Sequence, residues 1–170
     1  HNPHERMRFF MDIQKIYAAI GDATPMKTDC GAICGAACCH TDDDGKGGVA
    51  LLACEREILQ DISWGEIGRD ASMDAPMLMC SGMCDRDLRP FLCRIFPLCP
   101  TIGKNNRWTV RMDARARAVC PLAGSGLTGL NPEFVRGAAR AVRLLAEDPA
   151  GEAFLIRWTA IENEFRKPLW

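Results

Sequence analysis

Ten cysteines, nine of them gathered in two parts of the chain, are the residues of this sequence best suited to chemistry. The first group places four thiols within ten residues, as Cys30, Cys34, Cys38 and Cys39. The second group begins with Cys80 and Cys84, and Cys93, Cys99 and Cys120 follow. Thiolate is a soft ligand that suits Zn²⁺, Cu(I) and iron–sulfur clusters. The pattern therefore predicts a protein that binds a metal ion.

The number of thiols matches what such sites need. A tetrahedral zinc site takes four protein ligands, and so does a [4Fe–4S] cluster. The two groups, separated by about 40 residues, would close on one site or form a pair of sites. Because Cys38 and Cys39 are adjacent, they can point in different directions, and one of them could serve a second ion.

Some polar or sulfur-bearing residues have simpler explanations. A lone cysteine is usually a small buried apolar residue, which favours a core position for Cys54 and also for Cys99, with ligation by Cys99 left open. His40 follows Cys39 and is either a nitrogen ligand or an exposed loop residue. The acidic run 42–44 lacks the spacing of an EF-hand and indicates a solvated turn.

Other functional classes find less support in the residues. A cysteine-nucleophile hydrolase needs a histidine held near the thiol. The chain has three histidines, and two of them are His1 and His4 at its beginning. Arginines surround the second cysteine group, at Arg86, Arg89 and Arg94 and again between 111 and 117. They either offset the charge of a thiolate site and donate hydrogen bonds to it, or form ordinary surface ion pairs.

Composition limits the choice of partners and of compartment. The 170 residues, 48% of them apolar, suit one compact domain with a core of its own. A formal net charge of -1 gives no electrostatic reason to expect nucleic acid or a membrane as partner. We therefore expect the metal ion as ligand, with no nucleic-acid or membrane partner and with any protein partner undetermined.

The same cysteines would form disulfides in an exported protein, because oxidising compartments favour that bond. Residues 1–10 lack the apolar segment of a signal peptide, and no stretch approaches the ~20 apolar residues of a membrane span. Clustered cysteines in cytosolic chains are more often metal ligands. We expect a cytoplasmic location, although the chain begins at His1 rather than Met and a preceding segment stays possible.

The elements that must position these cysteines are mostly helical. Helical periodicity and end signals predict helices over 1–20 and 55–62, a short one from Pro90 to Phe96, and two after Asn131 and Asp148. A short strand is expected at 49–52, and a small hairpin is expected to end in 107–112. We predict a mainly α fold: a single irregular helical domain over 1–170, with a cysteine-rich metal-binding middle at about 28–123, a minor β-hairpin, and a C-terminal helical hairpin at about 131–166.

Three segments resemble one known family. They are the C-x3-C-x3-C-C stretch at 30–39, the apolar run leading into Glu55 and Glu57, and the segment 84–97, which contains R-P-x-x-C-R-x-F-P. They are similar to the YkgJ-like cysteine-cluster family, described as a zinc- or iron-chelating domain, over about residues 28–123. The resemblance implies chelation by a set of cysteines from both groups: Cys30, Cys34, Cys38 or Cys39 or both, Cys80, Cys84, Cys93 and Cys120.

The resemblance supplies no reaction. A related group includes flagellin lysine methylases, but this chain is short and has no glycine-rich loop for S-adenosylmethionine. Its C-x3-C-x3-C spacing also differs from the C-x3-C-x2-C of radical enzymes that use that cofactor. The prediction is a protein that holds zinc by cysteine thiolates, structurally or for storage and delivery. The alternative is an iron–sulfur protein with redox or methyltransferase-related activity, and whether the protein is an enzyme stays open.

Overall fold

A computed structural model describes residues 13–39, 48–81 and 84–168. The fold mixes helices with two small antiparallel sheets, one of three strands and one of two. The prediction of a mainly α fold is therefore wrong. The missed strands are short and carry no regular alternation of apolar and polar residues, which is the signal that a sequence pattern needs.

The three-stranded sheet has the order β1-β3-β2. Its strands are β1 (Val49–Ala50), β2 (Gly65–Asp70) and β3 (Ala75–Cys80). Leu78 at the middle of β3 pairs with Val49 on one side and Ile67 on the other. Leu78 also packs with Leu51 and Leu59 in a small cluster of fully buried side chains. This sheet ends at Cys80, the first cysteine of the second group.

The two-stranded sheet is the hairpin that the sequence predicts. It pairs β4 (Leu98–Ile102) with β5 (Trp108–Met112), and the Gly103 N–H donates to the Arg107 carbonyl at 2.9 Å to close the turn. Just before β4 lies the predicted short helix, α4 (Phe91–Ile95), which carries Cys93.

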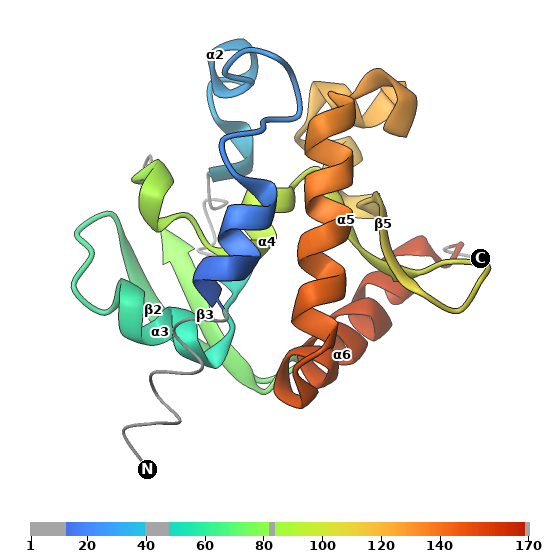
Figure 1. Ribbon diagram of the computed structural model, residues 1–170. Coiled ribbons are helices and arrows are strands. Elements are labelled where there is room, and N and C mark those ends of the chain that lie inside the picture. The colour runs from blue at the N-terminus through green and yellow to red at the C-terminus, as the bar shows by residue number, and fades with distance from the viewer. Residues whose placement is uncertain (1–12, 40–47, 82–83, 169–170) are drawn as a thin grey trace.

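Both predicted C-terminal helices are present. Helix α5 (Pro132–Ala146) begins at Asn131, whose side chain accepts from the Glu133 N–H, and α6 (Pro149–Arg166) begins at Asp148, which accepts from the first N–H groups of that helix. Helix α5 packs on β5 and on α6. Residues 13–20 are helical too and lie beside α5 (Figure 1), where Arg140 donates to the Ala19 carbonyl at 3.2 Å.

The remaining elements are short. Helix α3 (Ala53–Leu59) begins two residues earlier than the predicted 55–62. The cysteine-bearing segments and their neighbours form single turns, which are α2 (Gly31–Cys34), η1 (Ala37–Cys39), η2 (Arg86–Leu88), η3 (Ala114–Ala118), η4 (Pro121–Ser125) and η5 (Leu127–Gly129). Within the described ranges, no helix is both long enough and apolar enough to span a bilayer.

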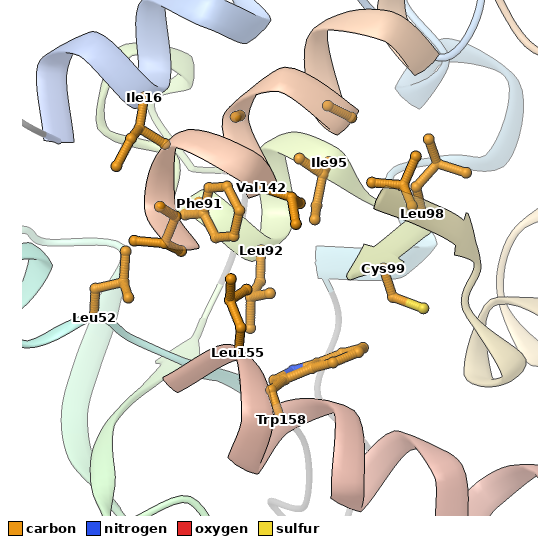
Figure 2. Close-up of a cluster of buried hydrophobic side chains, with 14 of the residues drawn as sticks. Ile16, Leu52, Phe91, Leu92, Ile95, Leu98, Cys99, Val142, Leu155 and Trp158 are labelled. Carbon is orange, nitrogen blue, oxygen red and sulfur yellow. The ribbon is translucent and has the colours of Figure 1, made fainter. Parts of the chain in front are cut away.

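The main core lies between α4, α5 and α6 (Figure 2). Phe91 and Ile95 from α4 and Val142 from α5 are completely buried. Burial of each such side chain contributes roughly 1.5–3 kcal/mol. This core fixes the orientation of α4, and α4 in turn places Cys93 on the opposite side, among the other cysteines.

Candidate metal centre

The first cysteine segment reverses direction within ten residues. Helix α2 follows Cys30 and ends at Gly35, which has φ 62°, a left-handed conformation that favours glycine. The Gly35 N–H donates to the Gly31 carbonyl and closes the turn. The reversal brings the thiol of Cys38, in η1, back to within electrostatic range of Cys34 and Cys30.

The second segment is held by a chain of local bonds. After Cys80 at the end of β3, the chain reaches Cys84, and Asp85 begins η2 by accepting from the Asp87 N–H at 2.9 Å. Pro90 then precedes α4, so that Cys93 follows after one further turn. The last predicted ligand, Cys120, stands directly before η4, and its N–H donates to the Ala116 carbonyl at 2.7 Å.

Four thiols from three of these segments gather into one set, which we call the inner thiols: Cys39, Cys80, Cys84 and Cys93. Burial, and then the nearby thiols of Cys80, Cys39 and Cys84, raise the pKa of Cys93. A hydrogen bond with Cys39, followed by burial, raises the pKa of Cys84. Both shifts favour the neutral thiol, because a thiolate there would be desolvated and close to its neighbours.

The other four predicted ligands form a second set, the pocket thiols: Cys30, Cys34, Cys38 and Cys120. Burial, and then Cys34, Asp29 and Cys120, raise the pKa of Cys30. The two sets are in contact. The side chains of Cys38 and Cys39 share a hydrogen bond that lowers the pKa of Cys38 and raises that of Cys39, and Cys38 also lies within electrostatic range of Cys93.

All four pocket thiols line a pocket of about 480 Å³, which Cys93 also reaches. This volume falls within the range of pockets that bind small molecules. The remaining inner thiols, Cys39, Cys80 and Cys84, are outside the described lining. Apolar side chains complete the walls, among them Met26, Ile33, Val119 and Leu122.

The pocket wall is tied to the core helices by Asn131. Its N–H donates to the Pro25 carbonyl at 2.8 Å, and its side-chain amide donates to the Thr24 carbonyl at 3.3 Å. The same residue caps α5. Sequence reasoning missed this wall, because residues 20–26 and 119–122 carry no pattern that marks a binding surface. Two apolar side chains of the wall, Ile33 and Val119, are exposed in the structure.

The thiols are neighbours without yet converging on a point. Among the residues that the structure describes, no group of three or more His, Cys, Asp or Glu side chains is placed to hold a metal ion. The donor type suits zinc or an iron–sulfur cluster, and all eight predicted ligands are close to at least one other. Coordination of one metal ion would require the short cysteine segments to move closer to one another.

Arg89 interacts with several of the predicted ligands. Arg89 donates from Nε to the Cys84 sulfur at 3.4 Å, and it also lies within electrostatic range of Cys39, Cys93 and Cys30. A guanidinium in this place offsets thiolate charge and supplies a hydrogen bond to sulfur.

Arg94 has a different role. Its guanidinium lies 3.8 Å from the centre of the Tyr17 ring, and it donates to the backbone carbonyls of Arg89 and Asp87 at 2.6 and 2.7 Å. It therefore positions the backbone of the segment that carries Arg89. Arg86 makes a long ion pair of 3.8 Å with Asp29, which ties η2 to the first cysteine segment.

Beneath these segments lies a buried carboxylate, Glu55. It accepts hydrogen bonds from the Tyr17 hydroxyl, from the Phe91 N–H at 2.6 Å and from the Leu52 N–H at 2.9 Å. Burial raises its pKa, although these hydrogen bonds oppose the shift. Glu55 thus joins the helical residues 13–20, the start of α3 and the start of α4, the helix that bears Cys93.

The remaining two cysteines lie in the core. Cys54 is 8% exposed and Cys99 is fully buried. Burial raises the pKa of each to about 12, so both stay protonated at neutral pH. Both positions agree with the expectation that a lone cysteine acts as a small apolar residue. His1, His4, His40 and the acidic run 42–44 lie outside the described residues.

Comparisons with family models, with curated proteins and with solved structures found no match. The resemblance to the YkgJ-like family therefore stays an expectation from the sequence.

Proposed function

We propose that this protein binds metal through its clustered cysteine thiolates and that the metal is zinc. The observation that carries the proposal is the gathering of eight thiols from four stretches of chain in one neighbourhood. These stretches are 30–39, 80–84, the helix α4 and the turn before η4. Cysteines that served only as small apolar residues would be buried in the core, as Cys54 and Cys99 are.

The chemistry of the donors supports the same proposal. Mutual proximity and partial burial make several charged thiolates unfavourable without a cation, and a bound cation reverses this. The guanidinium of Arg89 supplies one positive charge. Each zinc ion would supply two more and would cross-link segments that are otherwise single turns.

Because the thiols do not converge in the described structure, binding is coupled to closure of the cysteine segments in this proposal. Ligands that must deprotonate and move together make metal binding part of the folding free energy. A cytoplasmic location belongs to the proposal as well, since a reducing compartment keeps the thiols available as ligands.

The test is elemental analysis of protein purified without oxygen and without added metal, together with acid-labile sulfide and a visible spectrum. Zinc without sulfide is the expected result. Iron with a matching amount of sulfide would mean that the same ligands hold an iron–sulfur cluster instead of zinc. Protein that contains neither metal, and that takes up neither from micromolar solutions, would overturn the proposal.

A matched pair of variants tests the ligand assignment. Cys93→Ser should lower the metal content and the stability together. Cys54→Ser removes a thiol of the core and should leave the metal in place. Loss of metal in Cys54→Ser, with metal retained in Cys93→Ser, would show that the proposed ligands are the wrong ones.

A further inference from the structure

The pocket beside the cysteines has an apolar wall in addition to its thiols. Met26, Ile33, Val119 and Leu122 belong to this wall. Ile33 is 59% exposed and Val119 is 40% exposed, although both are large apolar side chains. Apolar side chains that line a concave surface gain free energy when an apolar ligand removes them from water. The wall therefore suits the apolar part of a small molecule.

One cation of the pocket has hydrogen-bond donors without a partner. Arg89 lines the pocket and is half-buried, and its Nε atom donates to the Cys84 sulfur at 3.4 Å. Within residues 13–39, 48–81 and 84–168, neither Nη atom of Arg89 makes a hydrogen bond, and no carboxylate forms an ion pair with the guanidinium. Because a guanidinium donates from its Nη atoms as well as from Nε, these N–H groups remain available to a ligand.

The other two arginines of the pocket are already engaged. Arg94 packs over the Tyr17 ring and donates to two backbone carbonyls. Arg86 is exposed and makes its ion pair with Asp29 at 3.8 Å. Arg89 is therefore the cation of the pocket best placed to bind an anion.

Three carboxylates also line the pocket, and they limit the charge that a ligand can carry. Asp22, Asp29 and Asp87 are all exposed, so water and salt weaken their repulsion of an anion. That repulsion still grows with each negative charge on the ligand. A single half-buried guanidinium therefore suits one negative charge, and its planar fork matches a carboxylate.

We propose that this pocket binds a small organic acid, with the carboxylate of the ligand on the Nη atoms of Arg89 and its apolar body against the wall that contains Ile33 and Val119. The volume of about 480 Å³ gives room for such a molecule. The proposal goes beyond metal binding and does not rest on it, because the carboxylate uses the N–H groups of Arg89 that the Cys84 sulfur leaves available.

The first experiment compares two ligands by isothermal titration calorimetry on wild-type protein, as purified and under reducing conditions. Octanoate and octanamide share an apolar chain, and the amide head group is neutral and close in shape to the carboxylate. Octanoate should bind about tenfold or more tightly than octanamide, as expected for hydrogen bonds to a charged group. The comparison needs no variant, so it does not depend on how well a variant folds. Failure of octanoate to bind, or equal affinities for the two ligands, would overturn the proposal.

Variants then locate the ligand. Arg89→Met should lower the affinity for octanoate to that for octanamide, and this ratio is insensitive to a general loss of stability. Ile33→Asp should weaken octanoate binding by about tenfold or more, because it removes an apolar contact and adds a negative charge to the wall. Ile156→Asp is the matched control, since Ile156 is 55% exposed on α6 and lies outside the described lining. It should bind octanoate as wild type does.

Two results with these variants would contradict the proposal. One is a preference for octanoate that persists in Arg89→Met, and the other is equal weakening by Ile33→Asp and Ile156→Asp. Elemental analysis of the same samples reports metal binding separately. Protein that binds octanoate but no metal would overturn the proposed function alone, and protein that binds metal but no octanoate would overturn this proposal alone.

Discussion

The Nε atom of Arg89 donates a hydrogen bond to the sulfur of Cys84 at 3.4 Å, although four residues lie between them in the chain. The two residues flank η2, so this contact closes the turn over the inner thiols. Arg94 lies in the same stretch of the chain, but its guanidinium packs over the Tyr17 ring. Two neighbouring arginines of one motif thus serve different ends.

We expect Arg89→Met to weaken metal binding by about tenfold, a typical effect of removing a partner that supports a ligand. The cause is loss of the hydrogen bond to sulfur and of the positive charge near four thiols. Competition with a chelator of known affinity measures the change. Arg94→Met is the control, and it should lower stability while leaving the metal affinity within a factor of two or so of wild type. Equal losses of affinity in both variants would contradict the distinct roles.

Glu55→Gln should lower the free energy of unfolding by about 1–3 kcal/mol, because a buried N–H would then lack its carboxylate acceptor. Urea unfolding measures this loss, and Glu57→Gln, at an exposed position of the same helix, should be close to neutral. Burial raises the folded-state pKa of Glu55 above the ordinary value of 4.5. The contribution of its proton is therefore present below that value and is lost as pH rises through the raised pKa.

The difference in unfolding free energy between wild type and Glu55→Gln should accordingly be larger at pH 5 than at pH 7. Taking the difference cancels the titration of the thiols, which both proteins share. A difference that grows with pH would mean that the folded state prefers the ionised carboxylate.

Glu162→Gln should show the opposite dependence on pH. Although burial alone would raise its pKa, hydrogen bonds from Arg166, the Ala114 N–H and Arg111 lower it below the ordinary value. The stabilisation from Glu162 is then present above about pH 4.5 and is lost as pH falls through the lowered pKa.

We expect this substitution to cost about 1.5–3 kcal/mol at pH 7, as for hydrogen bonds to a charged group, and less at pH 3. Thermal or urea unfolding at the two pH values is the measurement. Glu164→Gln changes an exposed carboxylate in the same helix and should have little effect at either pH. A constant difference from pH 7 to pH 3 would show that the ion pairs with Glu162 contribute nothing.

Gly151→Ala should destabilise the junction of α5 and α6 by about 1–3 kcal/mol or more, as overpacking does. A Cβ at this position would lie 2.2 Å from the Leu145 carbonyl oxygen and 2.7 Å from the Leu145 side chain. Gly68→Ala is the control, since a Cβ there meets no atom within 4 Å. Unfolding midpoints of the two variants, measured side by side, decide the matter, and equal midpoints would refute the steric argument.

The sequence revealed those helices and strands whose start signals or periodicity lie within a few residues. Asn131-Pro132 and Asp148-Pro149 carry the start of each C-terminal helix within a few residues, and both helices are present. The β4–β5 hairpin was predictable from the alternation in 108–112 and the turn residues before it. Strands β2 and β3 gave no such signal. Strand β2 contains two glycines, three charged side chains and one apolar side chain, Ile67. Strand β3 has no polar side chain to alternate with its apolar ones.

The sequence indicated which cysteines could act together but not how they are arranged. Spacing grouped the cysteines, and apolar neighbours favoured core positions for Cys54 and Cys99, with ligation by Cys99 left open. The return of Cys38 toward Cys30 and Cys34 depends on the left-handed turn at Gly35, which a spacing pattern does not reveal. Similarly, Arg89 and Arg94 look equivalent in the sequence, and a contact with the distant Tyr17 separates them.

The hydrogen bonds from Asn131 to Thr24 and Pro25 join parts of the chain more than a hundred residues apart. During synthesis, every cysteine leaves the ribosome before Asn131 does. The wall of the pocket therefore forms late, because bringing together the ends of so long a loop costs chain entropy. Until then the thiols that line the pocket lack this wall, so the newly made chain leaves them more accessible to solvent than the folded chain does.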